Sequence, residues 1–368
     1  MGAMTEGGEA STPKLPERPL AGLRVQFSGE VSKSWMSSRQ RMESLRWLGA
    51  DVTVLDTRAF VRNRGLMDKI VPRMLGLPTW PDIIAEWNEA ALALRDQPAP
   101  AIAWFEWPRY ARVRTLEALR EAWPQATFVC FQDDNPFGLR RERRNWKLFH
   151  EVISFWDVHL VKRNRDIENF RKAGARDVRL FQSGYFEPLF EIDEPPSPSH
   201  DVVFIGTALD RRVPFIEELV FEHGIDVRVF GLGGKWERSR LAKIRPDLLG
   251  PQLFDESYVR ALRDHRICLA FVSHSNQDEY SMRTFEIPAT GSFMLAERTP
   301  MHQRFFREGE EVEFFGSVAE CAEKIRRYLA DENGRREVAA QGAKRCRLAG
   351  YGLRHQVLAA VEDILDRG

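Results

Sequence analysis

The chain has 368 residues, 43% of them hydrophobic and 11% aromatic, which is enough to bury a large core and to form two domains of ordinary size. Lysine plus arginine and aspartate plus glutamate both total 54, and the zero formal charge excludes a whole-protein field that would attract a polyanion or an anionic membrane. Any anion-binding site must therefore be local.

The first half of the chain alternates strand-like and helix-like segments. Residues 1–19 are rich in Gly, Pro, Ser, Thr and Glu, so we predict a disordered tail there. Residues 20–194 then run through repeated β-α-β patterns, which predicts a parallel sheet covered by helices on both faces. The segments, in chain order, are strand 23–27, helix 37–48, strand 49–57, strand 101–107, helix 113–123, strand 127–131, and further alternation over 152–163 and 177–185.

A segment rich in proline and serine, EPPSPSH at Glu194–His200, interrupts this periodicity and predicts a domain boundary. Residues 200–350 repeat the β-α-β order, and residues 353–368 predict a final helix. The strands are expected at 201–207, 225–230, 266–272, 292–297 and 312–315, and a pair of helices over 318–347 with a break near Asn333 and Gly334. The predicted fold class is α/β, with two Rossmann-like, doubly wound domains facing a cleft.

The four cysteines are Cys130, Cys268, Cys321 and Cys346, and their wide spacing indicates neither a metal site nor a disulfide framework. We expect reduced, buried thiols. The sequence also has no run of about 18 apolar residues and no basic region followed by an apolar one at its start. These features predict a cytoplasmic protein without a transmembrane segment.

Ligands of open α/β sheets bind at the carboxyl ends of strands, where loops and helix N-termini offer backbone N–H donors. In the second half, GTALDRR joins a turn at Gly206 and Thr207 to Arg211 and Arg212, whose guanidinium groups match phosphate oxygens. This loop is either a diphosphate site or a solvated helix start. Gly231, in GLGGKW, either allows close contact with a base or sugar or forms a tight turn. Neither half has the GxGxxG spacing, so a dinucleotide-dependent dehydrogenase is disfavoured.

The stretch SMRTFEIPATGSFMLAE places Arg283 and Glu286 one helical turn apart on the same face, in a helix that Pro288 shortens or kinks. If the helix N-terminus points at the ligand, the arginine neutralises phosphate and the carboxylate accepts ribose hydroxyls. The alternative is an ordinary intrahelical ion pair worth roughly 0.3 kcal/mol.

This stretch, followed by FFREGEEVEFFGSVAECAEKIRRYLADENGRREVAAQGAKR, resembles the C-terminal half of GT-B glycosyltransferases, most closely the CgeB-like (spore-maturation-protein-like) group. The resemblance covers roughly residues 200–360. It implies that Glu286 holds the nucleotide ribose and that Arg283 lies beside the diphosphate. The wider retaining group has a second acidic residue eight positions earlier, where this chain has Asp278. The resemblance also implies that the final helix crosses back to the N-terminal domain.

The same resemblance implies a UDP- or GDP-linked sugar donor in the C-terminal domain, an acceptor in the N-terminal domain, and no metal or other cofactor. Asp133 and Asp134, in FQDDNP, are candidates to orient or deprotonate the acceptor hydroxyl, although a turn or cap explains them equally. Glu30 and Glu106 compete for that role, because both follow apolar strands. His274 is a candidate sugar or phosphate contact or a solvated loop residue.

Two other function classes stay open. A nucleotide-sugar epimerase of the same shape would release a changed sugar nucleotide without an acceptor, and a non-catalytic module would only bind the nucleotide sugar.

The basic run Leu139–Lys147 either meets an acidic acceptor or forms a solvated helix face. The sequence names neither the donor sugar nor the acceptor, and it leaves open whether the acceptor is a protein, a glycan, a small molecule or a nucleic acid. The anomeric outcome and the oligomeric state stay open as well.

Overall fold

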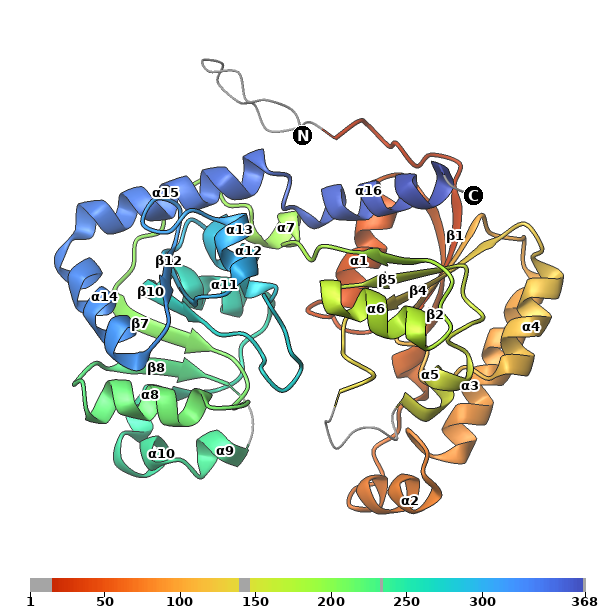
Figure 1. Cartoon of the computed structure of the whole chain (residues 1–368), viewed down its shortest axis with the longest axis horizontal. Helices are drawn as coiled ribbons and strands as arrows, with labels where there is room; N and C mark the ends of the chain where they lie inside the picture. Colours follow the sequence, from red (N-terminus) through yellow and green to blue (C-terminus); the bar gives the residue numbers. More distant parts are fainter. Residues whose placement is uncertain (1–14, 139–145, 232–233, 367–368) are drawn as a thin grey trace. The chain divides into compact units, whose positions relative to one another are not determined.

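The computed structural model describes residues 15–138, 146–231 and 234–366, which form two compact units (Figure 1). The N-terminal unit contains Glu17–Ser183, the short segment His274–Asp278 and the chain from Gln356 onward. The C-terminal unit contains Gly184–Ser273 and Glu279–His355. The chain leaves the N-terminal unit at Ser183–Gly184, ahead of the proline-rich segment, which lies within the C-terminal unit.

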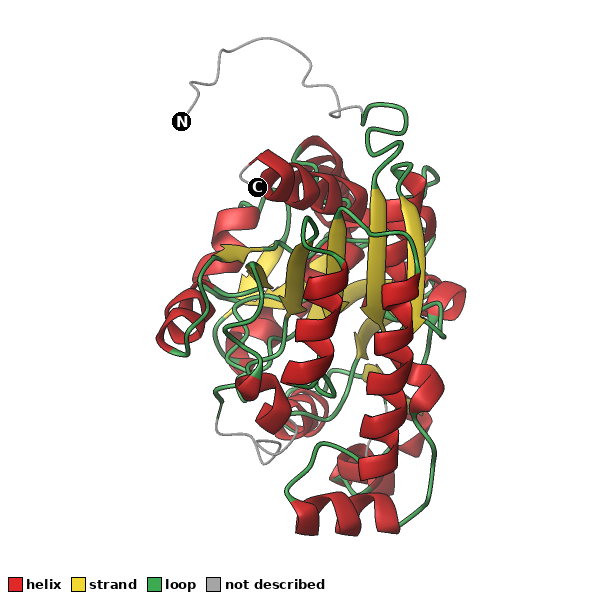
Figure 2. Ribbon diagram, turned by 90° about the vertical axis from the view of Figure 1, so that its right-hand side faces the viewer, coloured by secondary structure: helices red, strands yellow, loops and turns green. Residues whose placement is uncertain are grey.

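The N-terminal unit is built on a six-stranded sheet with the order β2-β1-β3-β4-β5-β6. All its pairs are parallel, with Val25 of β1 opposite both Val52 and Ile102. Figure 2 shows helices lying against this sheet. The elements are β1 Arg24–Gly29, α1 Ser37–Trp47, β2 Asp51–Asp56, α2 Met67–Leu75, α3 Pro81–Ala93, β3 Ile102–Glu106, α4 Val113–Ala122, β4 Thr127–Gln132, α5 Lys147–Glu151, β5 Val158–Val161, α6 Asn164–Lys172 and β6 Val178–Leu180, with 3-10 turns at Thr57–Phe60 and Leu94–Asp96.

Both faces of the N-terminal sheet are buried, as strand β3 shows. Ala103 and Phe105 point into a large apolar cluster that includes α3 and α4. Trp104, between them in sequence, stacks instead between Phe27 and Phe131, with ring centroids 6.4 Å away on each side. Successive strand residues face opposite sides, so a fully apolar strand such as β3 requires helices on both.

The C-terminal unit has a second parallel six-stranded sheet, with the order β12-β11-β10-β7-β8-β9. Its elements are α7 Glu187–Phe190, β7 His200–Ile205, α8 Arg212–Phe221, β8 Val227–Phe230, α9 Gly234–Glu237, α10 Arg240–Ile244, a 3-10 turn Pro246–Leu248, β9 Leu249–Gly250, α11 Asp255–Arg263, β10 His265–Ala270, α12 Arg283–Ala289, β11 Met294–Glu297, α13 Pro300–Phe305, β12 Glu313–Phe315, α14 Val318–Ala330 and α15 Glu332–Leu348.

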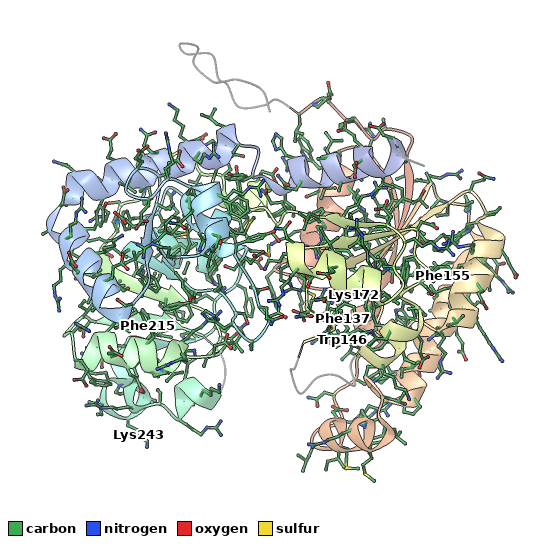
Figure 3. All side chains as sticks on the ribbon, viewed as in Figure 1. Phe137, Trp146, Phe155, Lys172, Phe215 and Lys243 are labelled. Carbon is green, nitrogen blue, oxygen red and sulfur yellow. The ribbon has the colours of Figure 1, made fainter. Side chains whose placement is uncertain are left out.

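The two faces of this sheet carry separate cores. In β10, Ile267 and Leu269 belong to one apolar cluster, whereas Cys268 and Ala270 belong to the other. Phe215 of α8, labelled in Figure 3, packs in the first cluster against Phe271 and Phe315 at 5.0 and 5.1 Å between ring centroids. The two doubly wound α/β halves predicted from the sequence are therefore confirmed.

The last helix, α16 (Leu353–Asp366), begins at the predicted residue, and its residues from Gln356 on belong to the N-terminal unit. There Arg179 of β6 pairs with Asp363 at 2.9 Å. The helix start is held in the C-terminal unit, because the Leu353 amide donates to the carbonyl of Tyr185 at 2.8 Å and the Arg354 amide donates to Glu187 at 3.0 Å.

The four cysteines are buried free thiols, as predicted. Burial raises the pKa of each, and the pKa of Cys130 is raised further by Glu106. Among the described residues, no helix combines the length and the apolar character that a membrane span requires.

Candidate functional site

The strand order of the C-terminal sheet reverses between β7 and β10. In open α/β sheets, ligands bind outside the carboxyl ends of the strands at such a switch point. Gly206 follows β7 and Gly231 follows β8, while α12 begins on the connection that leaves β10. Three segments selected from the sequence therefore meet at one edge of this sheet.

The two glycines bring the ends of β7 and β8 into close contact. The Gly206 amide donates to the Phe230 carbonyl at 2.9 Å, and the Trp236 indole donates to the Gly206 carbonyl at 3.1 Å. A Cβ at Gly231 would overlap the Gly206 carbonyl oxygen, so Gly231 forms a tight backbone contact that no side chain permits. A Cβ at Gly206 would lie 2.8 Å from the Phe204 ring and 3.5 Å from Nη2 of Arg283. The guanidinium of Arg283 therefore reaches the end of β7.

Arg283 is half-buried at the start of α12, and its Nε is buried without a hydrogen-bond partner. Within the described part of the chain, its side chain forms no hydrogen bond and no ion pair closer than 4.0 Å. The ordinary intrahelical ion pair with Glu286 is therefore not formed. A guanidinium that has lost water without gaining a partner is costly, and it is suited to receive a ligand anion.

Glu286 lies one turn further along α12 and is 8% exposed. The Tyr258 hydroxyl of α11 donates to its Oε2 at 2.9 Å. Burial raises the pKa of the Glu286 carboxyl, and the opposing effects of Arg283 and the Tyr258 hydroxyl are smaller. Tyr258 was not selected from the sequence, where nothing distinguishes it from other tyrosines on an amphipathic helix.

The remaining residues of the GTALDRR loop divide into two groups. Arg212 is buried and donates to the carbonyls of Thr207 at 3.1 Å and Val272 at 3.0 Å. It therefore holds together the loops that leave β7 and β10. Thr207 and Arg211 are exposed on the same loop, where their side chains are accessible to a ligand.

Asp278 and His274 lie in the short segment that belongs to the N-terminal unit. Asp278 pairs there with Arg163 at 2.8 Å and with Lys162 at 3.5 Å, and it accepts from Asn276 at 3.0 Å. Arg163 is fully buried. His274 is exposed. Asp278 is therefore held by residues of the N-terminal unit, whereas Arg283 and Glu286 belong to the C-terminal unit.

A second switch point lies in the N-terminal sheet, between β1 and β3. A pocket of about 170 Å³ opens there, and it is lined by Glu30, Met36, Ser37, Ser38, Thr57, Glu106, Trp107 and Arg109. Arg109 donates to Glu30 at 3.2 Å, and Arg58 lies 3.7 Å from the same carboxylate. The Glu30 side chain is 28% exposed, so it remains accessible to a bound hydroxyl compound.

Glu106 contributes to this pocket differently, because its carboxylate is already occupied. Arg41 of α1 donates to both its oxygens at 2.6 and 2.7 Å, and the Trp104 indole donates at 3.2 Å. Both members of the pair are buried, and the Arg41 guanidinium lies 3.9 Å from the centroid of the Phe131 ring. Glu106 therefore ties α1 to β3, which leaves Glu30 as the accessible carboxylate of the pocket.

We expect Glu106→Gln to lower the free energy of unfolding by about 3–5 kcal/mol, because it leaves the buried Arg41 guanidinium without its counter-charge. Urea denaturation measures this change, with Glu30→Gln as the control that alters an accessible carboxylate of the same pocket and shifts the midpoint little. Equal midpoints for wild type and Glu106→Gln would show that the pair has no structural role.

Asp133 and Asp134 follow β4. The Trp107 indole donates to Asp133 at 2.6 Å, and Trp107 has a φ of 49°, an uncommon value for a bulky residue. Trp107 also packs against Trp146, labelled with Phe137 in Figure 3, at 6.1 Å between ring centroids.

The turn interpretation of the FQDDNP segment is confirmed at Asn135, whose side chain accepts from the Phe137 amide at 3.0 Å. The carbonyl of Asp134 accepts from Gln132 at 3.1 Å. Of the basic run, residues 139–145 lie outside the described residues, as does part of the GLGG turn.

Comparisons with known proteins agree with this architecture. A family model described as glycosyl transferase-like matches residues 211–362. No curated protein sequence matches the chain significantly. Sucrose-phosphate synthase from Thermosynechococcus elongatus superposes with a TM-score of 0.64 at 13% identity, over 94% of this chain and 98% of that one. A glycosyltransferase from Rickettsia africae gives 0.61 at 10% identity, over 93% and 97%. HepE from Anabaena, solved with UDP-glucose, gives 0.59 at 12% identity, over 93% and 100%.

These likenesses establish the fold, which is that of GT-B glycosyltransferase structures. The family model covers most of the C-terminal unit, including Arg283 and Glu286. The sequence identity to each solved structure is low, so the ligands of those proteins are not assigned to this chain.

Proposed function

We propose that the protein is a glycosyltransferase that moves a sugar from a UDP- or GDP-linked donor to an acceptor hydroxyl without a metal ion. The observation that carries this proposal is the half-buried Arg283, which has no partner among the described residues and begins the helix that holds Glu286. The glycosyl transferase-like family match and a solved neighbour with UDP-glucose support it. As part of this proposal we assign the protein to the CgeB-like group, and the RTFEIPATG stretch supports that assignment.

In this proposal, the ribose hydroxyls of the donor donate to Glu286. The Tyr258 hydroxyl already binds Oε2 and so fixes the orientation of the carboxylate. Arg283 and the backbone N–H groups of the loop after Gly206 bind the diphosphate and stabilise the negative charge that develops on it as the glycosidic bond breaks. The close contact between Gly206 and Gly231 lets backbone, rather than side chains, line the site.

The acceptor is proposed to bind in the N-terminal unit, at the pocket lined by Glu30 and Arg109. Of the two carboxylates that line this pocket, Glu30 is the better placed to orient the acceptor hydroxyl, because Arg41 occupies both oxygens of Glu106 whereas the Glu30 side chain is 28% exposed. General-base assistance of this kind contributes about 10²- to 10⁴-fold to a rate.

A panel of UDP- and GDP-sugars tests the proposal. We expect one donor to release free nucleoside diphosphate slowly by transfer to water, at a rate that a chelator does not change. An epimerase would instead convert the sugar on an intact nucleotide, and a binding module would bind the donor without changing it. Either of these results, or loss of activity with chelator, contradicts the corresponding part of the proposal.

A further inference from the structure

A cavity of about 420 Å³ lies in the C-terminal unit at the sheet edge opposite Gly206. His265 and Arg266, which line it, begin β10, and Ser292 and Phe293 immediately precede β11. The other walls are the chain segment 192–198 and one face of α15. Parallel strands run from this edge to the switch point, so the cavity is distinct from the proposed nucleotide site.

Four arginines line this cavity, and two of them have no partner in the part of the chain that the structure describes. Arg335 of α15 is 3% exposed, and its Nη1 is buried without a hydrogen bond. Among the described residues, neither the Arg335 nor the half-buried Arg347 side chain forms a hydrogen bond or an ion pair. By contrast, Arg336 pairs with Glu332, and Arg266 pairs with Asp201, each at 2.6 Å.

Two carboxylates, Asp193 and Glu194, also line the cavity, from the segment opposite α15. Both are exposed, and neither forms an ion pair with the arginines. Burial lowers the pKa of Arg335. The charges of Glu332 and Asp201 oppose this shift, and those of Arg266 and Arg336 add to it. Among the described residues, the buried Arg335 guanidinium thus has no carboxylate in direct contact, an arrangement that costs stability until an anion enters.

Apart from His265 and Ser292, the rest of the lining is apolar. Ala339, Ala340 and Ala343 lie on α15, and Pro196 and Phe293 are part of the same apolar surface. The volume lies within the range of about 300–1,000 Å³ typical of small-molecule sites, and it exceeds what an inorganic anion fills. The ligand that fits has an anionic group for the arginines and a larger body for the apolar wall.

We propose that this cavity binds a phosphorylated small molecule, with its phosphate on Arg335 and Arg347 and its body against the alanine face of α15. Guanidinium groups present several N–H donors in a planar fork, which matches two phosphate oxygens at once. The proposal does not depend on glycosyl transfer, because none of its residues belongs to the proposed donor site.

Isothermal titration calorimetry with glucose 6-phosphate tests this proposal, with glucose as the neutral comparison. We expect glucose 6-phosphate to bind wild type and Arg283→Ala equally, and Arg335→Met at least about tenfold more weakly. Arg304→Met, which alters an exposed arginine outside the cavity, should bind as wild type does. No binding to wild type, equal binding to Arg335→Met, or binding lost only in Arg283→Ala would overturn the proposal.

A second measurement separates ligand binding from a structural role for Arg335. In phosphate-free buffer we expect Arg335→Met to have a melting temperature equal to or above that of wild type, because the variant removes an unpaired buried charge. A variant that melts much lower, or does not fold, would show that Arg335 supports the fold. In that case Arg347→Met, at a less buried position, decides the binding proposal by the same titration, since unchanged affinity there would overturn it.

Discussion

Replacing Glu286 by glutamine is expected to weaken UDP or GDP binding by about 10- to 100-fold, equivalent to roughly 1.5–3 kcal/mol for a hydrogen bond to a charged group. The side chain is buried and its orientation is fixed by Tyr258, so the isosteric substitution removes charge without opening a cavity. Calorimetric titration measures the change. Glu337→Gln, which alters an exposed carboxylate of α15, is the control. Unchanged affinity in Glu286→Gln would remove Glu286 from the donor site.

The same substitution has a predicted pH dependence of stability. Burial raises the pKa of Glu286 above its ordinary value of 4.5, so folding favours the protonated form. The contribution of the protonated Glu286 carboxyl to the stability of the fold is fully present below pH 4.5. This contribution is lost as the pH rises through the raised pKa. We therefore expect Glu286→Gln to become more stable relative to wild type as the pH increases from 4 to 8. A constant or opposite difference in denaturant midpoint would contradict the proposed desolvation of this carboxylate.

Deleting residues 356–368 is expected to destabilise the N-terminal unit by several kcal/mol. Val357, Leu358, Val361 and Ile364 are between 0 and 6% exposed, and each such side chain contributes about 1.5–3 kcal/mol by burial, an upper estimate. The ion pair of Asp363 with Arg179 is lost as well. We expect the truncation to abolish sugar transfer more completely than nucleotide binding, since the Arg283 and Glu286 site lies in the C-terminal unit.

Two point variants test whether the buried face of α16 accounts for the effect of the truncation. Val361→Ala, at a fully buried position, is expected to cost about 2 kcal/mol, whereas Leu365→Ala, at a position 45% exposed, should cost little. Differential scanning calorimetry of both variants and of the truncation measures the effect. Equal stability and full activity of the truncated protein would show that α16 contributes nothing to the N-terminal unit.

Much of the fold follows from local patterns in the sequence. The buried strands are short apolar runs, and α16 begins and ends where its apolar periodicity does. Helices α2 and α3 were not predicted. The large hydrophobic residues in and before α2 do not form a packed face, because six of them are exposed: Val61, Leu66, Met67, Ile70, Met74 and Leu75.

The break between α14 and α15 lies at Asp331 and not at Asn333 and Gly334, so that prediction was wrong by two residues. The Asp331 side chain accepts from the Gly334 amide at 2.9 Å. Asp331 is therefore the N-cap of α15, and Gly334 lies in the first helical turn, where a glycine is tolerated.

The candidate site was predictable only in part, for a physical reason. The carboxyl ends of parallel strands form one edge of a sheet, so loops after β7 and β8 had to meet. The pairing of individual side chains depends on contacts between residues far apart in sequence. Glu286 with Tyr258, Glu106 with Arg41 and Asp278 with Arg163 are separated by 28, 65 and 115 residues. No local pattern specifies such partners, so the sequence did not show that Glu106 and Asp278 are held by buried arginines.

The most direct test of the central proposal is a crystal structure of the protein with UDP. We expect the ribose hydroxyls to lie within hydrogen-bond distance of Glu286, and the diphosphate to lie on Arg283 and on the backbone N–H groups that follow Gly206. A UDP molecule bound with its diphosphate away from Arg283 and its ribose away from Glu286 would contradict the account.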